Sequence, residues 1–336
     1  MERELQNIRR LAETLRENLM KCADNPDEDP VHDLRTGTRR LQASLENLLR
    51  ELRSGDAGQL LRDATETMLR LLKKVRRAAG PVRDLDVHRK LLDKLVKRAT
   101  GVPDKKDTRT GRQEPKPGPR LVGQPDALET REAGLRATDV QGQAGHLDDW
   151  LKHRRNRQSR PLQKEAAIAA GKLDKRLAEL EAALRADSQR TRNTPAALMA
   201  LESFARLATE MQHLHAGNLH EFRKGAKKAR YVAELAAQDD AFAGRVAKAL
   251  KKLQDEIGDW HDWLVLAEEA HAALGDQAQE LTGLIEGERE RHFVTAMKAA
   301  VKLRGQLMGE WLAVAPPPRR RPEAERKSSS PRGATA

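Results

Sequence analysis

The stretch His220-Glu221-Phe222-Arg223-Lys224-Gly225-Ala226-Lys227-Lys228 decides the architecture, because an earlier stretch has the same pattern. The earlier copy reads His32-Asp33-Leu34-Arg35-Thr36-Gly37-Thr38-Arg39-Arg40, at an offset of 188 residues. Both copies contain a histidine, a base at +3, glycine at +5 and bases at +7 and +8. At 3.6 residues per turn, positions 0, +3 and +7 lie on one face of a helix. Each copy therefore predicts a helix that carries a histidine and two cations in one stripe.

The charge of these stripes indicates what they bind. Like charges stacked along a helix repel one another, so a purely structural role would disperse them. Guanidinium groups suit phosphate because their planar fork donates two hydrogen bonds at once. The whole chain carries a net charge of +12 and has a sequence pI near 9.9. These observations favour a polyanionic partner, such as polyphosphate, nucleic acid or an acidic membrane surface.

Composition sets the fold class. The chain has 336 residues, of which 38% are hydrophobic, 3% are aromatic and 34% are charged. Leucine and alanine dominate the apolar set, and Arg, Glu, Lys and Gln surround them, which is a helix-forming composition. Few β-branched or aromatic runs exist from which to build a sheet. We therefore predict an all-α protein with one or two hydrophobic cores.

A second repeated segment extends the internal duplication. The segment Gly80-Pro81-Val82-Arg83-Asp84-Leu85-Asp86-Val87 aligns with Gly258-Asp259-Trp260-His261-Asp262-Trp263-Leu264-Val265 at an offset of 178 residues. Under that offset Arg70, Lys73 and Lys74 fall on Lys248, Lys251 and Lys252. Five helices per half, repeated once, is the simplest architecture. Helices are expected near 3–22, through the first stripe to about 53, and at 57–79, 82–98, 147–186, 195–216, 218–237, 240–257, 260–274 and 277–313.

The remaining segments have a different character. Residues 100–146 are rich in Gly, Pro, Thr and charges without periodicity, and they predict a flexible insertion in a first repeat of residues 1–190. The second repeat is expected at 194–315, and a disordered basic tail at 316–336. The one cysteine, Cys22, excludes an intramolecular disulfide and fits a reducing compartment. No signal peptide or membrane-spanning stretch is found, which predicts a cytoplasmic protein.

Taken together, the repeated segments resemble a known family. A His-x-x-Arg-x-x-x-[Arg/Lys]-[Arg/Lys] helix with a downstream Gly-x-x-Arg-Asp-x-Asp-Val segment is similar to the CHAD domain, the conserved histidine α-helical domain. The second half repeats the helix pattern and, in the downstream segment, has His261 in place of the Arg and Leu264 in place of the second Asp. The run Arg223-Lys224-Gly225-Ala226-Lys227-Lys228-Ala229-Arg230-Tyr231 carries much of the likeness. The resemblance covers residues 1–315 apart from the insertion. It implies two four-helix bundles related by a pseudo-twofold axis, with a basic central groove or pore. It also implies binding of inorganic polyphosphate and association with polyphosphate granules and their proteins.

The resemblance also implies which side chains contact the ligand. Carried over by position, the polyphosphate-binding residues are His32, Arg35, Arg39, Arg40, Arg70, Lys74, His220, Arg223, Lys227, Lys228, Arg230, Lys248 and Lys252. For His32 and His220 the alternative is a helix-start residue packed between helices, and for Tyr231 it is packing rather than a place beside the site. Asp84, Asp86 and Asp262 are interpreted as helix caps that also orient the opposing arginines.

Two other functions compete with polyphosphate binding. A phosphohydrolase needs carboxylates gathered on a metal or a nucleophile with its base, but Asp259, His261 and Asp262 point around the helix axis and cannot converge. Neither a metal site nor a cofactor nor catalysis is therefore expected. Non-specific binding of nucleic acid through its phosphates is the nearer alternative, although few aromatic residues are available for base stacking. Membrane binding is disfavoured because the apolar faces of the basic helices are needed for the core.

Overall fold

The computed structural model describes residues 2–50, 56–101, 127–186, 196–234, 237, 240–275 and 278–314, and all of its regular elements are helices. The all-α prediction is confirmed for this part of the chain. The helices are α1 (Glu2–Asp24), α2 (Glu28–Arg50), α3 (Asp56–Ala99), α4 (Ala127–Ala186), α5 (Ala196–Glu210), α6 (Ala216–Glu234), α7 (Ala241–Leu274) and α8 (Gln279–Val314). Residues 102–126 of the predicted insertion and the predicted tail lie outside the described residues.

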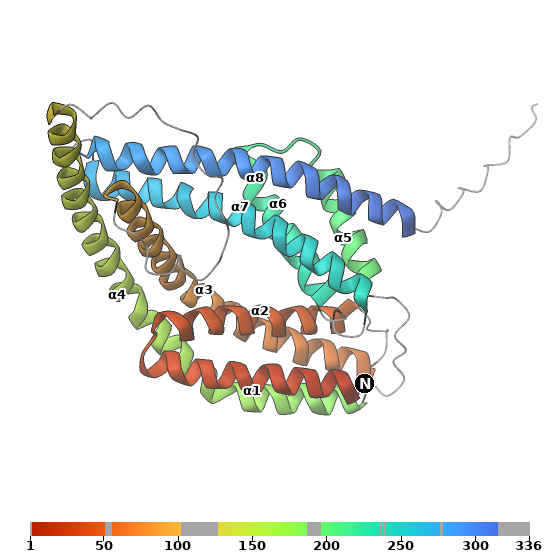
Figure 1. Ribbon diagram of the computed structural model, residues 1–336. Helices are drawn as coiled ribbons and strands as arrows, with labels where there is room; N and C mark the ends of the chain where they lie inside the picture. The colour runs from red at the N-terminus through yellow and green to blue at the C-terminus, as the bar shows by residue number, and fades with distance from the viewer. Residues whose placement is uncertain are drawn as a thin grey trace, which may run out of the picture.

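Each half of the chain forms a bundle of four helices. In the first half α1 packs on α2 and α4, and α3 packs on the same two helices (Figure 1). In the second half α5 packs on α6 and α8, and α7 packs on the same two. The prediction of five helices per half is therefore wrong, although the order of contacts is the same in both halves. The pseudo-twofold relation between the halves stays a prediction.

The helices form because their leucines and alanines recur at helical spacing and meet in closed cores. Ile8, Leu15, Leu34 and Leu45 are fully buried in the core of the first bundle, among residues from α1 to α4. In the second bundle Phe204 of α5 packs edge-on against Phe222 of α6, with ring centroids 5.8 Å apart. The apolar faces of α2 and α6 are thus used for packing, and their basic faces remain for other contacts.

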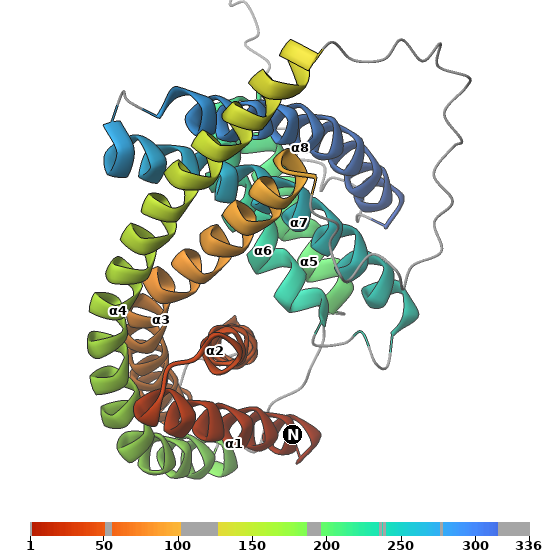
Figure 2. The same ribbon diagram turned by 60° about the vertical axis from the view of Figure 1, so that its left-hand side comes forward.

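The extra predicted helix in each half is absent because two long helices continue where a break was expected. Helix α3 runs through Gly80-Pro81 and α7 runs through Gly258. A proline inside a helix removes one hydrogen bond and bends the axis, but packing on both sides can preserve the helix. The upper and lower parts of α3 run in different directions, and α4, which contains Pro161, bends similarly (Figures 1 and 2). Gly-Pro at 80–81 is therefore a bend rather than an end.

The two bundles meet in a third hydrophobic core. The far ends of α3, α4, α7 and α8 contribute, for example, Leu92, Leu147, Trp263 and Leu281, all of them buried. Buried polar contacts cross the same region, since His88 Nδ1 of α3 lies 2.6 Å from Glu269 Oε2 of α7. Contacts between halves therefore hold the bundles in a fixed relation, which positions the stripes of α2 and α6.

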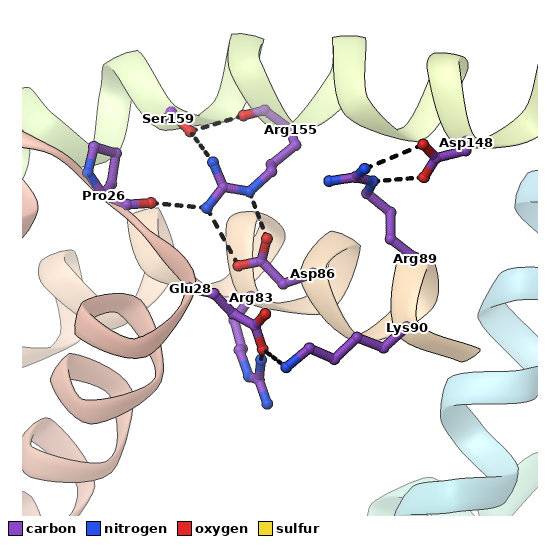
Figure 3. Close-up of polar contacts among 9 residues, drawn as sticks. All are labelled: Pro26, Glu28, Arg83, Asp86, Arg89, Lys90, Asp148, Arg155 and Ser159. Atoms are coloured by element: carbon purple, nitrogen blue, oxygen red, sulfur yellow. Dashed lines mark hydrogen bonds and ion pairs between the residues drawn. The ribbon is translucent and has the colours of Figure 1, made fainter. Parts of the chain in front are cut away.

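A network of charged groups fixes the bend of α4 against α3 and the α1–α2 turn. Arg155 of α4 donates through Nε to Asp86 of α3 at 2.5 Å and through Nη2 to the carbonyl oxygen of Pro26 at 2.8 Å (Figure 3). Arg83 and Lys90 of α3 both pair with Glu28 at the start of α2. The Asp86 side chain is only 5% exposed, so this carboxylate depends on Arg155 for its pairing.

The expected end of the insertion is wrong. Helix α4 begins at Ala127, and within it Val140 and Ala144 are buried in the third core. Apolar residues recur there at a spacing of four, but flanking glycines and polar residues obscure the helical pattern in the sequence. Among the described helices, none has a stretch long and apolar enough to cross a bilayer.

Candidate functional site

The first basic stripe is anchored by Arg35. Its Nη1 donates to the carbonyl oxygen of Gly80 at 2.8 Å and lies 3.3 Å from Asp84 Oδ1. A Cβ atom at residue 80 would come within 3.3 Å of the same nitrogen, so glycine gives the guanidinium room at the bend of α3. The Arg35 side chain is 18% exposed, and burial lowers its pKa while Asp84 opposes that effect. Arg35 therefore joins α2 to α3 and remains partly exposed.

The second stripe repeats this arrangement with different partners. Arg223 Nε donates to the main-chain carbonyl of Gln254 at 3.1 Å, and its Nη2 would lie 2.6 Å from a Cβ atom at residue 258. Burial lowers the pKa of Arg223, and Asp262 opposes that effect. The recurring glycine of the second repeated segment is thus explained in both halves, because it leaves space for the arginine of the neighbouring helix.

The two stripes meet at Lys227. Burial and, after it, the charges of four arginines together lower the pKa of Lys227 to about 6; these arginines are Arg223, Arg39, Arg35 and Arg230. Two of these arginines come from α2 and two from α6, and the two helices are in contact. The stripes predicted from sequence therefore converge between the halves, around a lysine whose charged form is disfavoured first by burial and then by the neighbouring arginines.

A further arginine belongs to this group and was missed from the sequence. Arg76 of α3 is half-buried, and its pKa is lowered by burial and by the charge of Arg39, with Tyr231 among its other neighbours. It lies four residues before Gly80, on the same face of α3. Matching basic residues between the repeats could not find it, because Gln254 stands at the aligned position. We refer to Arg35, Arg39, Arg76, Arg223, Lys227 and Arg230 as the cation cluster.

The histidines of the two stripes differ in their surroundings. His32 is exposed at the start of α2, whereas His220 is half-buried, with its ring centroid 4.0 Å from that of His261. Burial lowers the pKa of His220, and burial together with His220 lowers the pKa of His261 to about 4. His220 therefore packs against His261 of α7, and its contact with the ligand stays a prediction. Tyr231 carries the guanidinium of Arg230 over its ring at 4.5 Å, which places it beside the cation cluster.

The remaining predicted contacts lie outside the cation cluster as the structure stands. The side chains in question are all exposed: Arg40, Arg70, Lys74, Lys228, Lys248 and Lys252. Arg70 contacts Thr67 and Glu66 within its own helix. Lys74 precedes Arg76 by two residues, so the two side chains diverge by about 200° around α3. The aligned Lys252 stands in the same relation to Gln254 on α7. These lysines form an outer basic surface rather than part of the buried group.

The three aspartates are not helix caps, because α3 and α7 run through their positions. Asp84 pairs with Arg35, as the second part of the interpretation proposed, and Asp86 pairs with Arg155 instead. Burial raises the pKa of Asp262, and Arg223 opposes that shift. Asp84 therefore holds Arg35 of the cation cluster in place, whereas Asp86 holds Arg155 outside the cluster.

Among the described residues, neither a metal site nor a reactive cysteine competes with the cation cluster as the candidate site. Among them, no three His, Cys, Asp or Glu side chains are grouped so that they could hold a metal ion. Cys22 is buried, and burial raises the pKa of its thiol to about 12. The arrangement that stands out is a set of partly desolvated cations supplied by both halves, and what it can do chemically is hold an anion.

The fold and this site define a class of protein: an all-α chain of two four-helix bundles with a cation cluster between them. The chain belongs to the CHAD domain family, because the family model matches residues 6–271. A crystal structure of the CHAD domain from the plant Ricinus communis is similar to this chain at 17% sequence identity and a TM-score of 0.49. That match covers 91% of this chain and 89% of the other. No match to a curated protein sequence is found.

Proposed function

We propose that this protein binds inorganic polyphosphate through the cation cluster, with His32, His220 and the exposed bases beside it as further contacts. The observation that carries the proposal is the environment of Lys227, whose pKa of about 6 results from burial and four neighbouring arginines. Such crowding is unfavourable unless an anion neutralises it, because like charges in a poorly solvated place repel strongly. A phosphate chain supplies one negative charge per unit at a spacing that several arginines can share.

Burial of the cluster favours a thin ligand over a duplex. Arg35 and Arg230 have side chains that are 18% and 14% exposed, which suits a single chain lying between helices. Single-stranded nucleic acid is disfavoured because the chain has one tyrosine, four phenylalanines and four tryptophans for base stacking. Duplex DNA could still bind the exposed lysines through its phosphates. Polyphosphate is therefore the first candidate and nucleic acid the alternative.

We further propose that the protein binds without catalysing a reaction on its ligand, and that it acts in the cytoplasm on polyphosphate granules. The proposal of no catalysis rests on the cation cluster, where arginines bind phosphate oxygens but supply no nucleophile or general base. The granule proposal rests on the family resemblance and on a ligand that is itself a granule component. Other granule proteins would then be its neighbours.

Competition between polyanions tests the proposal. Long-chain polyphosphate, short oligophosphates and duplex DNA at equal phosphate concentration would compete for the protein near physiological salt. We expect polyphosphate to win by orders of magnitude, to gain affinity with chain length, and to lose affinity as salt rises. Equal competition by DNA would mean that the lysines and arginines act as a generic basic surface.

A matched pair of variants locates the binding site. Arg39→Gln with Lys227→Gln removes one cation of the cluster from each half, whereas Lys74→Gln with Lys252→Gln removes two exposed cations at aligned positions outside it. Both variants replace two basic side chains by glutamine. We expect the first to weaken polyphosphate binding by about 100-fold, from about 1.5 kcal/mol per charged hydrogen bond, and the second by severalfold at most. Equal losses would contradict a role for the cation cluster.

Variants of Arg35 and Arg223 need a control for folding as well as a binding measurement. Their charge reversal to Glu should abolish binding, but both also donate to main-chain carbonyl groups of the neighbouring helix. Circular dichroism and thermal unfolding of the reversed variant would separate the two roles. Loss of helicity would identify these two arginines as structural, and the variants of Arg39 and Lys227 would then carry the test.

A further inference from the structure

Lys227 is the one lysine of the cation cluster, whose other members are arginines. The residue is partly buried, and its Nζ atom is not among the fully enclosed unpaired polar atoms of the described chain. Within the described residues it makes no hydrogen bond or ion pair, whereas the neighbouring Lys224 pairs with Glu221. Lys227 is therefore an amine without an anionic partner, in a place that small molecules can still reach.

The groups that surround this amine are cations from both halves of the chain. Arg223 and Arg230 lie one turn before and one turn after Lys227, on the same face of α6. The charges of Arg35 and Arg39 act on it from α2, which contacts α6. Both the burial and the position of the amine therefore favour its neutral form over its charged form.

The carboxylates of this region serve the arginines rather than the lysine. Asp84 of α3 pairs with Arg35, and Asp262 of α7 is the main charge that favours the ionised form of Arg223. With a pKa of about 6, most of the Lys227 amine is unprotonated near neutral pH. An exposed lysine is unprotonated there in roughly one molecule in a thousand. A lysine that lies beside other cations and has lost its proton is a nucleophile.

The arginines also select the electrophile. Guanidinium groups bind phosphate oxygens through two hydrogen bonds at once, so they hold small molecules that carry a phosphate. When a carbonyl group is joined directly to that phosphate, as in an acyl phosphate, the reactive carbon is held beside the amine. We infer that Lys227 is a modification site, at which small acyl phosphates such as acetyl phosphate acylate the amine within the cation cluster.

The reaction needs no further reagent. The lone pair of Lys227 Nζ forms a C–N bond to the carbonyl carbon, and the bond from that carbon to the phosphate oxygen breaks. The electron pair of the broken bond stays on the oxygen, and the released phosphate takes up the proton that the amine loses. The products are an amide on Lys227 and inorganic phosphate. Because the amide does not react again, the step is a single modification and not a turnover.

The consequence for polyphosphate rests on the proposed function. A bound phosphate chain covers the amine and favours its charged form, so an occupied site is protected. Acylation of an empty site removes one cation of the cluster and lowers the affinity for the next chain. Acyl phosphates would therefore inactivate only those molecules that hold no polyphosphate.

Acetylation of the full chain by acetyl phosphate near neutral pH tests the modification site. Tandem mass spectrometry follows each lysine over time, with the exposed neighbour Lys228 as the internal control. We expect Lys227 to react about tenfold faster, because the gain in unprotonated amine exceeds the loss of nucleophilicity that accompanies lower basicity. In urea that unfolds the chain, the two lysines should react alike. Equal rates in the folded protein would overturn the inference.

A neutral acetylating reagent tests the selection of the phosphate. With N-hydroxysuccinimide acetate, the arginines have no phosphate to bind, so the rate ratio of Lys227 to Lys228 should be severalfold smaller than with acetyl phosphate. The same ratio for both reagents would overturn the assignment to acyl phosphates.

Polyphosphate binding supplies the last measurement. Long-chain polyphosphate should protect Lys227, and the acetylated protein should bind it about tenfold more weakly, which corresponds to one charged hydrogen bond. Lys227→Arg keeps the charge but forms no amide, so acetyl phosphate should leave the affinity of that variant unchanged. The labelling itself contains no polyphosphate, so its outcome is separate from that of the proposed function. Selective acetylation with unchanged affinity would overturn the link between the two.

Discussion

The two halves hold their key arginine in the same way but surround it with different groups. Arg35 in the first half pairs with Asp84, whose side chain is 57% exposed. In the second half the matching Asp262 has a pKa raised by burial, and Arg223 opposes that rise. The first-half histidine, His32, is exposed, whereas His220 of the second half is half-buried and lies against the ring of His261. The second half is therefore the drier side of the site.

This difference separates the roles of the two stripes. In the first half the base at +7 is an arginine, Arg39, and arginine keeps its charge whatever its surroundings. In the second half the same position is Lys227, whose pKa of about 6 lets it lose its proton near neutral pH. Duplicated segments can thus share a geometry and still differ in their response to pH.

The halves also differ in how they secure α3 and α7. Asp86 of α3 is buried and paired with Arg155, whereas the aligned residue of α7 is Leu264, which packs against the second core. An ion pair in one half therefore stands where the other half has an apolar contact. A buried pair loses much of its Coulomb energy to desolvation, so the two solutions can be similar in net stability.

Removing one member of that pair should have the largest effect on stability. Asp86→Ala leaves Arg155 buried without its main carboxylate, and we expect a loss of about 3–5 kcal/mol in the free energy of unfolding. Urea unfolding followed by circular dichroism measures it. Asp148→Ala breaks the more exposed pair with Arg89 and should cost at most about 1 kcal/mol. If the double variant Asp86→Leu, Arg155→Leu recovers most of the lost free energy of unfolding, an apolar contact can replace the ion pair in the first half, as Leu264 does in the second.

The glycine of each basic stripe gives a smaller contrast. A Cβ atom at residue 225 would lie 2.5 Å from Leu207 Cδ2, whereas one at residue 37 would lie 3.5 Å from Leu15 Cδ1. Gly225→Ala should therefore overpack α5 against α6 and cost about 1–3 kcal/mol. Gly37→Ala fits and should gain up to about 1 kcal/mol from helix propensity. Thermal unfolding of the two variants side by side checks this, and equal effects would mean that α5 moves away without cost.

The sequence was sufficient where a pattern is local and repeated. Helical spacing, the two stripes and the glycines of the second segment all follow from residue order, and the structure joins them as Arg35 with Gly80 and Arg223 with Gly258. Arg76 shows the limit of that approach. It reaches the cation cluster because α3 bends beside α2, and the aligned Gln254 gives no signal of a cation at that place.

The false breaks predicted within α3 and α7 have one physical cause. Glycine and proline mark the end of an isolated helix, but Gly80-Pro81 and Gly258 lie inside helices that are packed on several sides. Tertiary contacts offset the lost hydrogen bond, so the chain bends and continues. Sequence patterns cannot distinguish these outcomes, because the compensating contacts come from residues far away, such as Arg155 with Asp86.

The smallest expected difference between the two halves is in the protons that they take up when a polyanion binds. The pKa of Lys227 lies near 6 in the folded protein and near 10.5 in an unfolded chain, so between these values the unfolded chain binds more protons. This group therefore adds to stability as pH rises through that window.

A bound polyanion favours the charged lysine, so binding should take up a proton and weaken by up to about tenfold per pH unit above pH 6. Calorimetry in buffers of different ionisation enthalpy counts the protons. Lys227→Arg should remove the uptake, because arginine stays charged, and Arg39→Lys should leave it in place. Undiminished uptake in Lys227→Arg would assign the proton to another group and leave the two halves electrostatically alike.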